Sequence, residues 1–266
     1  MFLRIHDATV HVALDGLEGA PPVLLLHSLG TEGRVWQPQA AALAGRYRVI
    51  RPDLRGHGLS GVTAGPGSMA RFAADAVAVL DALGIARAHV GGLSIGGMVA
   101  QALAAQAPDR VASLMLCDTA MMIPPASLWR ERAATVRAQG MPAIAEGVVA
   151  RWVTPAALGA AETEGLRTML LRTPPEGYAA AAEAIAAADL SASTAQLRLP
   201  ALVLVGAEDV ATPPAAAAAL AAAIPGAALI EIKGAAHIPT YERAEAVTDA
   251  MRRFLDRQVE AGETQR

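Results

Sequence analysis

The segment HVGGLSIGGMVAQ (residues 89–101) surrounds one serine, Ser94, with four glycines. An apolar run leads into it and a helical pattern leads out, so the chain is expected to turn sharply from a strand into a helix at the serine. Side chains two positions before and after the serine would collide in such a turn, which explains Gly92 and Gly96. The pattern G-x-S-x-G in this context predicts a nucleophilic hydroxyl above the carboxyl edge of a sheet. The alternative is a glycine-rich turn with a helix-capping serine.

Short apolar runs alternate with longer helical patterns, which predicts an α/β fold with a mostly parallel sheet covered by helices. The eight expected strands are LRIH, VHVAL, PVLLLH, YRVIRPD, AHVGGL, ASLMLCD, PALVLVG and ALIEI. Helices are expected near residues 34–44, 68–83, 94–107, 214–223 and 242–257. The final residues, EAGETQR, resemble a frayed polar tail.

The strand signal disappears after the sixth strand, where prolines punctuate helical patterns. We interpret this stretch as a helical cap inserted into the sheet. The expected division is a core of residues 1–120 and 190–266 and a cap of residues 121–189.

Composition excludes several classes of function. Of the 266 residues 53% are hydrophobic, which supplies a large core, and the net charge of −3 offers no basic surface for nucleic acid or an anionic membrane. The single cysteine, Cys117, excludes an internal disulfide and suits a reducing compartment, so we expect a cytoplasmic protein. The start MFLRIHDATVHV lacks the pattern of a secretory leader, and no apolar run approaches the ~20 residues of a membrane span. A homo-oligomer is compatible with the sequence.

A serine nucleophile needs a base, and the base needs a carboxylate to fix its tautomer. Among six histidines we choose His237, which follows the last expected strand at the same sheet edge as Ser94. Asp209 ends the strand PALVLVGAED and completes the chain order Ser, Asp, His of this hydrolase type. Asp118, directly after the sixth strand, is the second candidate for the acid, and Glu208 is the third.

Two backbone N–H groups are expected to bind the oxyanion of a tetrahedral intermediate. One belongs to Ile95, the residue after the nucleophile. The other belongs to Leu29 in the loop HSLGT, which follows the strand PVLLLH.

With these blocks the chain resembles the α/β-hydrolase fold family over nearly its whole length. The matching segments are LLLHSLGTEGRVW, RPDLRGHGLS, HVGGLSIGGMVAQ, LVGAEDVATP and GAAHIPTYE. Within that family it is most similar to the 3-oxoadipate enol-lactonases, on SLGT followed by tryptophan, RGHG, GLSIGGMVAQ, CDTA, LWRERAATVRAQGM and RWVTP. The resemblance implies a cofactor-free and metal-free serine hydrolase of aromatic catabolism that opens a small carboxylated enol-lactone through an acyl-enzyme.

The oxyanion loop differs from the usual family sequence, and the turn after the fourth strand has two possible roles. The usual oxyanion loop is His-Gly-x-Gly, and here Ser28 replaces the first glycine, which can narrow or reorient the hole. The turn that runs from Asp53 to Gly58 is interpreted as a salt-bridged scaffold, with substrate contact as the alternative.

The cap offers residues that could select a carboxylated substrate. Trp129, Arg132 and Val136 share one helical face, and an arginine and a tryptophan over the serine would suit a small acidic lactone. Trp152 and Arg151 form a second candidate pair. The alternative is a solvated Arg132 beside a tryptophan that packs the cap onto the core.

Two further functions stay open on the sequence. One is a general carboxylesterase or perhydrolase of the same fold, against which Leu29 counts because an aromatic residue is common there in perhydrolases. The other is a non-catalytic receptor for a small ligand, against which an intact Ser94, Asp209 and His237 argue. A dehalogenase is disfavoured, because that chemistry needs a carboxylate in place of Ser94.

Overall fold

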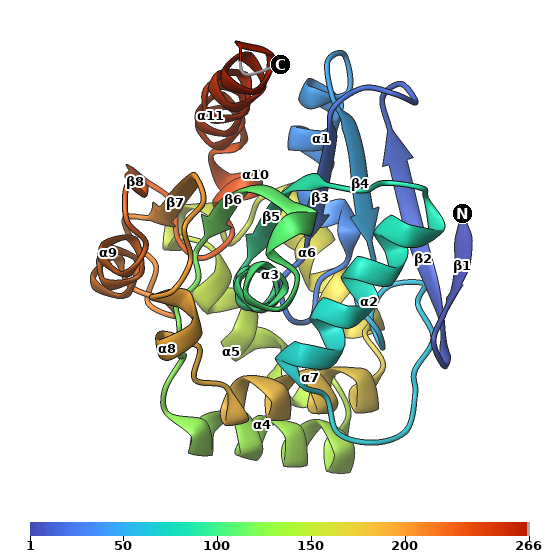
Figure 1. Ribbon diagram of the computed structural model, residues 1–266. Helices are drawn as coiled ribbons and strands as arrows, with labels where there is room; N and C mark the ends of the chain where they lie inside the picture. Colours follow the sequence, from blue (N-terminus) through green and yellow to red (C-terminus); the bar gives the residue numbers. More distant parts are fainter. Residues whose placement is uncertain (265–266) are drawn as a thin grey trace.

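The computed structural model describes residues 1–264, which form one eight-stranded sheet in the order β1-β2-β4-β3-β5-β6-β7-β8 (Figure 1). The pairs β1–β2 and β2–β4 are antiparallel, and all other neighbours are parallel. The expected mostly parallel sheet is therefore confirmed. The strands are β1 (Phe2–Ile5), β2 (Ala8–Asp15), β3 (Pro22–Leu26), β4 (Arg48–Pro52), β5 (Ala88–Leu93), β6 (Val111–Cys117), β7 (Ala201–Gly206) and β8 (Ala228–Ile232).

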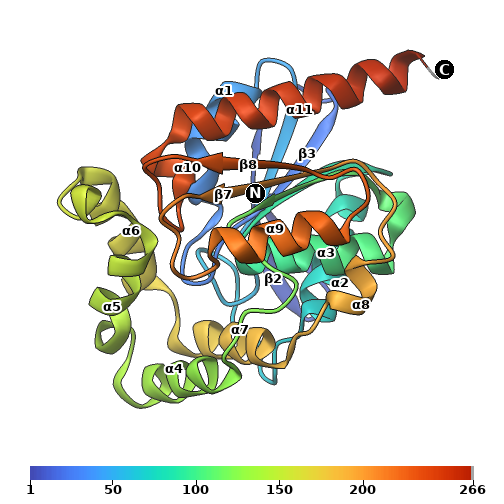
Figure 2. The same cartoon turned by 90° about the vertical axis from the view of Figure 1, so that its left-hand side faces the viewer.

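Helices cover both faces of this sheet and one end of its strands. Figure 2 shows α1 and α11 on one face, α2, α3 and α9 on the other, and α4 to α7 together beside the strand ends. The helices are α1 (Gln37–Leu43), α2 (Met69–Ala82), α3 (Ile95–Gln106), α4 (Ala126–Gln139), α5 (Pro142–Trp152), α6 (Ala161–Arg172), α7 (Pro175–Ala187), α8 (Ser191–Thr194), α9 (Pro214–Ala223), α10 (Pro239–Glu242) and α11 (Ala244–Thr264), with short 3-10 turns η1 (Gly33–Trp36), η2 (Pro108–Arg110) and η3 (Pro155–Ala157).

The central strands are apolar along their whole length because helices cover them on both sides. Every residue of β5 and β7 is buried, and so are the last four of β3. A strand buried on both faces shows a continuous apolar run rather than alternation. The edge strand β8 exposes four of its five residues. The core therefore lies under β3, β5, β6 and β7, whose carboxyl ends carry the site described below.

The helices α4 to α7 lie between β6 and β7 in the chain, as expected for a cap inserted after the sixth strand. Helix α7 approaches the core most closely at Gly177. A Cβ built there would lie 2.0 Å from the backbone oxygen of Gly56, and one built on Gly56 would lie 2.5 Å from the Cα of Gly177. These two glycines allow the backbone of α7 to rest directly on the loop after β4.

Two expected helices have different bounds in the structure. The helix expected over residues 34–44 begins as the 3-10 turn η1 and becomes α-helical at Gln37. Pro38 lies in the first turn of α1, where its missing N–H costs no helical hydrogen bond. The expected frayed tail is wrong up to Thr264. Helix α11 continues because Val259 packs against the core one turn beyond the buried Leu255. Residues 265–266 lie outside the described residues.

No helix within residues 1–264 is both long and apolar enough to cross a membrane.

Replacing Gly177 with alanine should destabilise the fold by about 1–3 kcal/mol, because the new methyl group meets the backbone of Gly56 and neither element can move without repacking. Gly147→Ala in α5 is the matched control. Gly147 is an exposed helical residue with open space around it, so alanine should stabilise by about 0.5–1 kcal/mol through helix propensity. Urea unfolding of both variants measures the difference, and equal stabilities would contradict the close-packing argument.

Candidate active site

A strained turn between β5 and α3 presents Ser94. Its backbone has φ 56° and ψ −119°, a conformation that few non-glycine residues adopt. A Cβ on Gly92 would lie 2.2 Å from the backbone oxygen of Gly96, and a Cβ on Gly96 would lie 2.3 Å from that of Leu26. The collision predicted from the sequence is therefore confirmed, and glycine is required on both sides of the serine.

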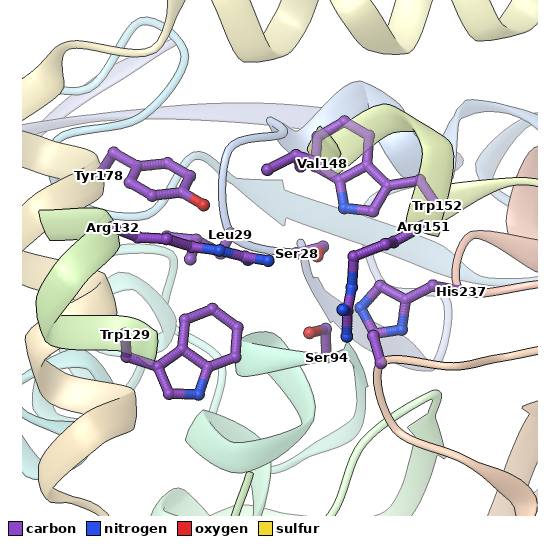
Figure 3. A pocket seen from close by; sticks show the side chains of 11 residues that line it. Ser28, Leu29, Ser94, Trp129, Arg132, Val148, Arg151, Trp152, Tyr178 and His237 are labelled. Carbon is purple, nitrogen blue, oxygen red and sulfur yellow. The ribbon is translucent and has the colours of Figure 1, made fainter. Parts of the chain in front are cut away.

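Hydrogen bonds hold the strained residue in place. The N–H of Ser94 donates to the carbonyl of Cys117 at 2.9 Å, and its carbonyl accepts the hydroxyl of Thr119 at 2.7 Å and the N–H of Gly97 at 2.9 Å. The hydroxyl of Ser94 points into a cavity that His237 also lines (Figure 3). The serine and the histidine predicted from the sequence are thus brought to one cavity.

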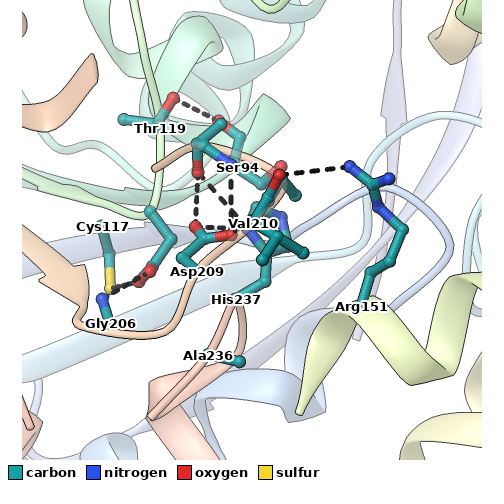
Figure 4. Close-up of polar contacts among 12 residues, drawn as sticks. Ser94, Cys117, Thr119, Arg151, Gly206, Asp209, Val210, Ala236 and His237 are labelled. Carbon is teal, nitrogen blue, oxygen red and sulfur yellow. Dashed lines mark hydrogen bonds and ion pairs between the residues drawn. The ribbon is translucent and has the colours of Figure 1, made fainter. Parts of the chain in front are cut away.

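The imidazole of His237 is oriented by Asp209. Its Nδ1 donates to Oδ2 of Asp209 at 2.8 Å, which leaves Nε2 as the proton acceptor on the side of the cavity (Figure 4). Thr212 donates its hydroxyl to the same carboxylate oxygen at 2.6 Å, and the N–H groups of Ala211 and Thr212 donate to the other. Burial raises the pKa of Asp209, but the charge of His237 and these hydrogen bonds outweigh it and lower the pKa to about 2. Asp209 is therefore ionised beside His237.

The other two carboxyl groups considered for the acid make different contacts. The side chain of Asp118 is buried and accepts from the N–H of Gly206 at 2.8 Å and from the thiol of Cys117 at 3.1 Å. Glu208 is exposed. Of the three, only Asp209 accepts a hydrogen bond from His237, so the geometry favours it.

One group of potential metal ligands occurs among the described residues, formed by Asp118, Asp209 and His237, with one donor atom of each within 4.8 Å of the others. The imidazole Nδ1 is already bound to Asp209, and both carboxyl groups accept hydrogen bonds from the protein. These contacts suit a hydrogen-bonded chain of side chains, and we assign no metal to it.

The loop after β3 aims a backbone donor at the cavity. The carbonyl of Ser28 accepts Nδ1–H of His27 at 2.8 Å and both the N–H and the hydroxyl of Thr31. In a trans peptide the next N–H points the opposite way, so the N–H of Leu29 faces away from these donors. Leu29 lines the cavity, and its N–H and that of Ile95 have no hydrogen-bond partner within residues 1–264. The geometry thus favours the two oxyanion donors expected from the sequence, and Ser28 orients the loop through its backbone.

His27 is the residue that fixes this loop. Its Nε2 accepts the N–H of Leu54 at 2.8 Å, so the ring is neutral with its proton on Nδ1. Burial lowers the pKa of His27, which keeps it in that form. Sequence reasoning did not assign this role.

The cap closes the cavity with cationic and aromatic side chains. About 340 Å³ of space, part of it open to solvent, lies between these side chains and Ser94. The guanidinium of Arg132 lies 5.0 Å from the ring centroid of Trp129, and Tyr178 lies on its other side in the cavity (Figure 3). The indole N–H of Trp129 donates to the carbonyl of Ile123, which fixes the ring. Arg132 and Trp129 therefore face the serine from α4, as expected.

Helix α5 supplies a second wall with Val148, Arg151 and Trp152. Arg151, the second candidate cation, donates to the carbonyl of Val210 at 3.3 Å and extends beside His237 (Figure 3). Tyr178 was not foreseen. Its only signal in the sequence is a lone tyrosine within an alanine-rich helix.

The turn after β4 has a structural role. Arg55 forms a bidentate ion pair with Asp75, and Asp53 accepts the N–H groups of Gly33 and Leu59. None of the residues 53–58 lines the cavity. The scaffold interpretation of this turn is therefore supported.

Comparison with known proteins shows the family to which the chain belongs. Residues 21–155 match the family model described as alpha/beta hydrolase fold, and residues 180–264 match one described as TAP-like protein. The chain belongs to the α/β-hydrolase family. A 3-oxoadipate enol-lactonase of Acinetobacter baylyi is 34% identical over 96% of both chains.

Solved structures of enzymes from the same family have a similar fold. The enol-lactonase of Burkholderia xenovorans superimposes with a TM-score of 0.94 at 39% identity, covering 96% of this chain and all of that one. A thermophilic esterase of Thermogutta terrifontis, with malate bound, has a TM-score of 0.90 at 36% identity over 94% of each chain. The α/β-hydrolase fold expected from the sequence is confirmed.

The variants Ser94→Ala and His237→Ala should each lower kcat for ester hydrolysis by on the order of 10⁴-fold or more, because each removes a group on which every step depends. Circular dichroism and thermal unfolding check that both remain folded. Near-normal hydrolysis by the folded Ser94→Ala variant would exclude Ser94 as the nucleophile.

Asp209→Asn should lower kcat by roughly 10⁴-fold, because an amide leaves the imidazole in the wrong tautomer. Glu208→Gln, whose side chain is exposed, and Asp118→Asn should cost far less. Steady-state kinetics of the three variants rank them, and a larger loss for Asp118→Asn would move the acid to the end of β6.

Proposed function

We propose that this protein opens a small enol-lactone that carries a free carboxylate, of the 3-oxoadipate enol-lactone type, through an acyl-enzyme on Ser94. The protein is a carboxylic ester hydrolase, in agreement with the enol-lactonases and esterases to which it is similar. The observation that carries the finer proposal is the cationic wall opposite the serine.

That wall is built for an anion. Arg132 and Arg151 are half-buried, line the cavity with Ser94, and form no ion pair with an acidic side chain among the described residues. Arg132 lies over the ring of Trp129 and beside Tyr178, so its guanidinium loses little freedom when it binds a ligand. A preorganised guanidinium with free N–H groups is suited to a carboxylate.

The reaction follows from the positions of the core residues. Ser94 Oγ attacks the ring carbonyl while Nε2 of His237 takes its proton, and Asp209 stabilises the resulting imidazolium. The N–H groups of Leu29 and Ile95 bind the oxyanion.

Collapse of the tetrahedral intermediate breaks the ring C–O bond. The leaving enol oxygen takes the proton from His237, and the enol tautomerises to a 3-oxo-acid that stays attached to Ser94 as an ester. Water then attacks this ester with His237 as the base, which releases the second carboxylate and restores the serine.

The proposal also covers the roles of the cap and the core and the place where the enzyme acts. Residues 121–189 act as a cap that determines substrate choice, while residues 1–120 and 190–266 supply the chemistry. The enzyme acts in the cytoplasm, in keeping with a single buried thiol.

Arg132→Ala should raise KM for a carboxylated enol-lactone by about 10-fold to 100-fold, the loss expected for one charge-assisted hydrogen bond of ~1.5–3 kcal/mol. Hydrolysis of a neutral ester of similar size should change little. The comparison requires kcat/KM for both substrates in both proteins.

Arg130→Ala is the matched control, because Arg130 is an exposed residue of the same helix that does not line the cavity. It should leave both substrates unaffected. Equal losses on both substrates with Arg132→Ala would mean that this residue only supports the cap. No preference of the wild type for the carboxylated lactone would refute the enol-lactonase proposal.

A further inference from the structure

Asp118 is a buried carboxyl group that the proposed reaction does not use. It follows β6 with a left-handed backbone, φ 43°, and does not line the cavity, although one of its oxygens lies within 4.8 Å of atoms of Asp209 and His237. One carboxyl oxygen of Asp118 lies within 4.8 Å of one of Asp209, and both side chains are buried. An acidic pair thus lies behind His237.

The surroundings of the pair stabilise a negative charge on Asp209 well and a negative charge on Asp118 poorly. Asp209 accepts two backbone N–H groups, a hydroxyl and the imidazole of His237. Asp118 accepts one backbone N–H, from Gly206, and one weak thiol donor, from Cys117. No arginine or lysine forms an ion pair with Asp118 in the part of the chain that the structure describes.

Two carboxyl groups this close in a buried site do not both ionise near neutral pH, and the one that accepts more hydrogen bonds keeps the charge. Burial and then the charge of Asp209 raise the pKa of Asp118 well above its usual range. Burial likewise raises the pKa of the Cys117 thiol, which stays protonated and able to donate.

We propose that Asp118 is a neutral carboxylic acid that donates a hydrogen bond to Asp209, and is therefore a positioning residue for the Asp209–His237 pair. The proposal rests on the proposed function, because Asp118 acts only through the acid and the base of that reaction. Its proton does not enter the reaction. The hydrogen bond fixes the orientation of the Asp209 carboxylate. It also disperses part of the carboxylate charge that attracts the imidazolium of His237.

The experiment is a histidine titration by NMR in wild type, Asp118→Asn and Asp118→Ala, with His237 assigned from a His237→Gln spectrum. Asparagine tolerates the left-handed backbone, and its amide can donate to Asp209 while its oxygen accepts from Gly206. The other charged groups near His237 are Arg132 and Arg151 in the cavity and Glu242, which accepts the N–H of Ala236. They are the same in all three proteins.

For Asp118→Asn we expect the titration midpoint of His237 to stay within about half a pH unit of wild type, because one neutral donor replaces another. An ionised Asp118 would instead help to stabilise the imidazolium. Its removal would then lower the midpoint by about one unit or more, and that result would overturn the proposal.

For Asp118→Ala we expect the midpoint to rise by about half a unit to one unit, because Asp209 loses a donor and attracts the imidazolium more strongly. The acid limb of kcat/KM for a neutral aryl ester should move by the same amount, with a loss in kcat that Asp118→Asn largely rescues. If Asp118→Ala moves neither the midpoint nor kcat, the positioning role is wrong.

Should the alanine variant fail to fold, the titration of Asp118→Asn alone shows whether Asp118 is protonated in the wild type. The titration needs no turnover, so the proposal for Asp118 and the proposed function can be refuted independently of each other. A wild type that hydrolyses no ester refutes the proposed function, whereas a lowered midpoint in an active Asp118→Asn variant refutes only the neutral Asp118.

Discussion

At the turn that carries Ser94, segments from three strands and one helix come into backbone contact. A Cβ on Gly96 would meet the end of β3 at Leu26, and one on Gly97 would meet the side chain of Thr119 after β6 at 2.5 Å. Such crowding tolerates no side chain, so the positions of the serine, the oxyanion loop and the end of β6 are set together. Leu29 follows Leu26 by three residues, which is why its N–H reaches the same cavity as that of Ile95.

Charge is divided between the two parts of the molecule around this turn. The core contributes a buried negative charge on Asp209, stabilised by dipolar donors from the loop that follows β7 rather than by an ion pair. The cap contributes the positive charges of Arg132 and Arg151. Bond breaking thus depends on groups that any ester would use, while the cap presents groups that only an anionic substrate would use. This separation lets the cap change specificity without disturbing the reacting atoms.

The contact of Gly56 with Gly177 joins the two parts, because α7 rests on the same scaffold turn that Asp53 and Arg55 brace. Tyr178, the next residue of α7, is thereby brought to the cavity, where it lies beside Arg132. A pair of glycines in the scaffold therefore sets the position of a side chain that lines the cavity.

Local pattern alone determined the strands, most of the helices and the turn at Ser94, because apolar periodicity and glycine requirements act over a few residues. It also brought His237 and Asp209 to one sheet edge, since carboxyl ends of parallel strands share an edge. The choice among Asp209, Asp118 and Glu208 needed the tertiary structure. All three follow strands at that edge, and only hydrogen bonds between distant loops distinguish the ionised group from the buried neutral one and the exposed one. The roles of Tyr178 and His27 were hidden for the same reason: a side chain's partners come from segments far away in the chain, and no local pattern encodes them.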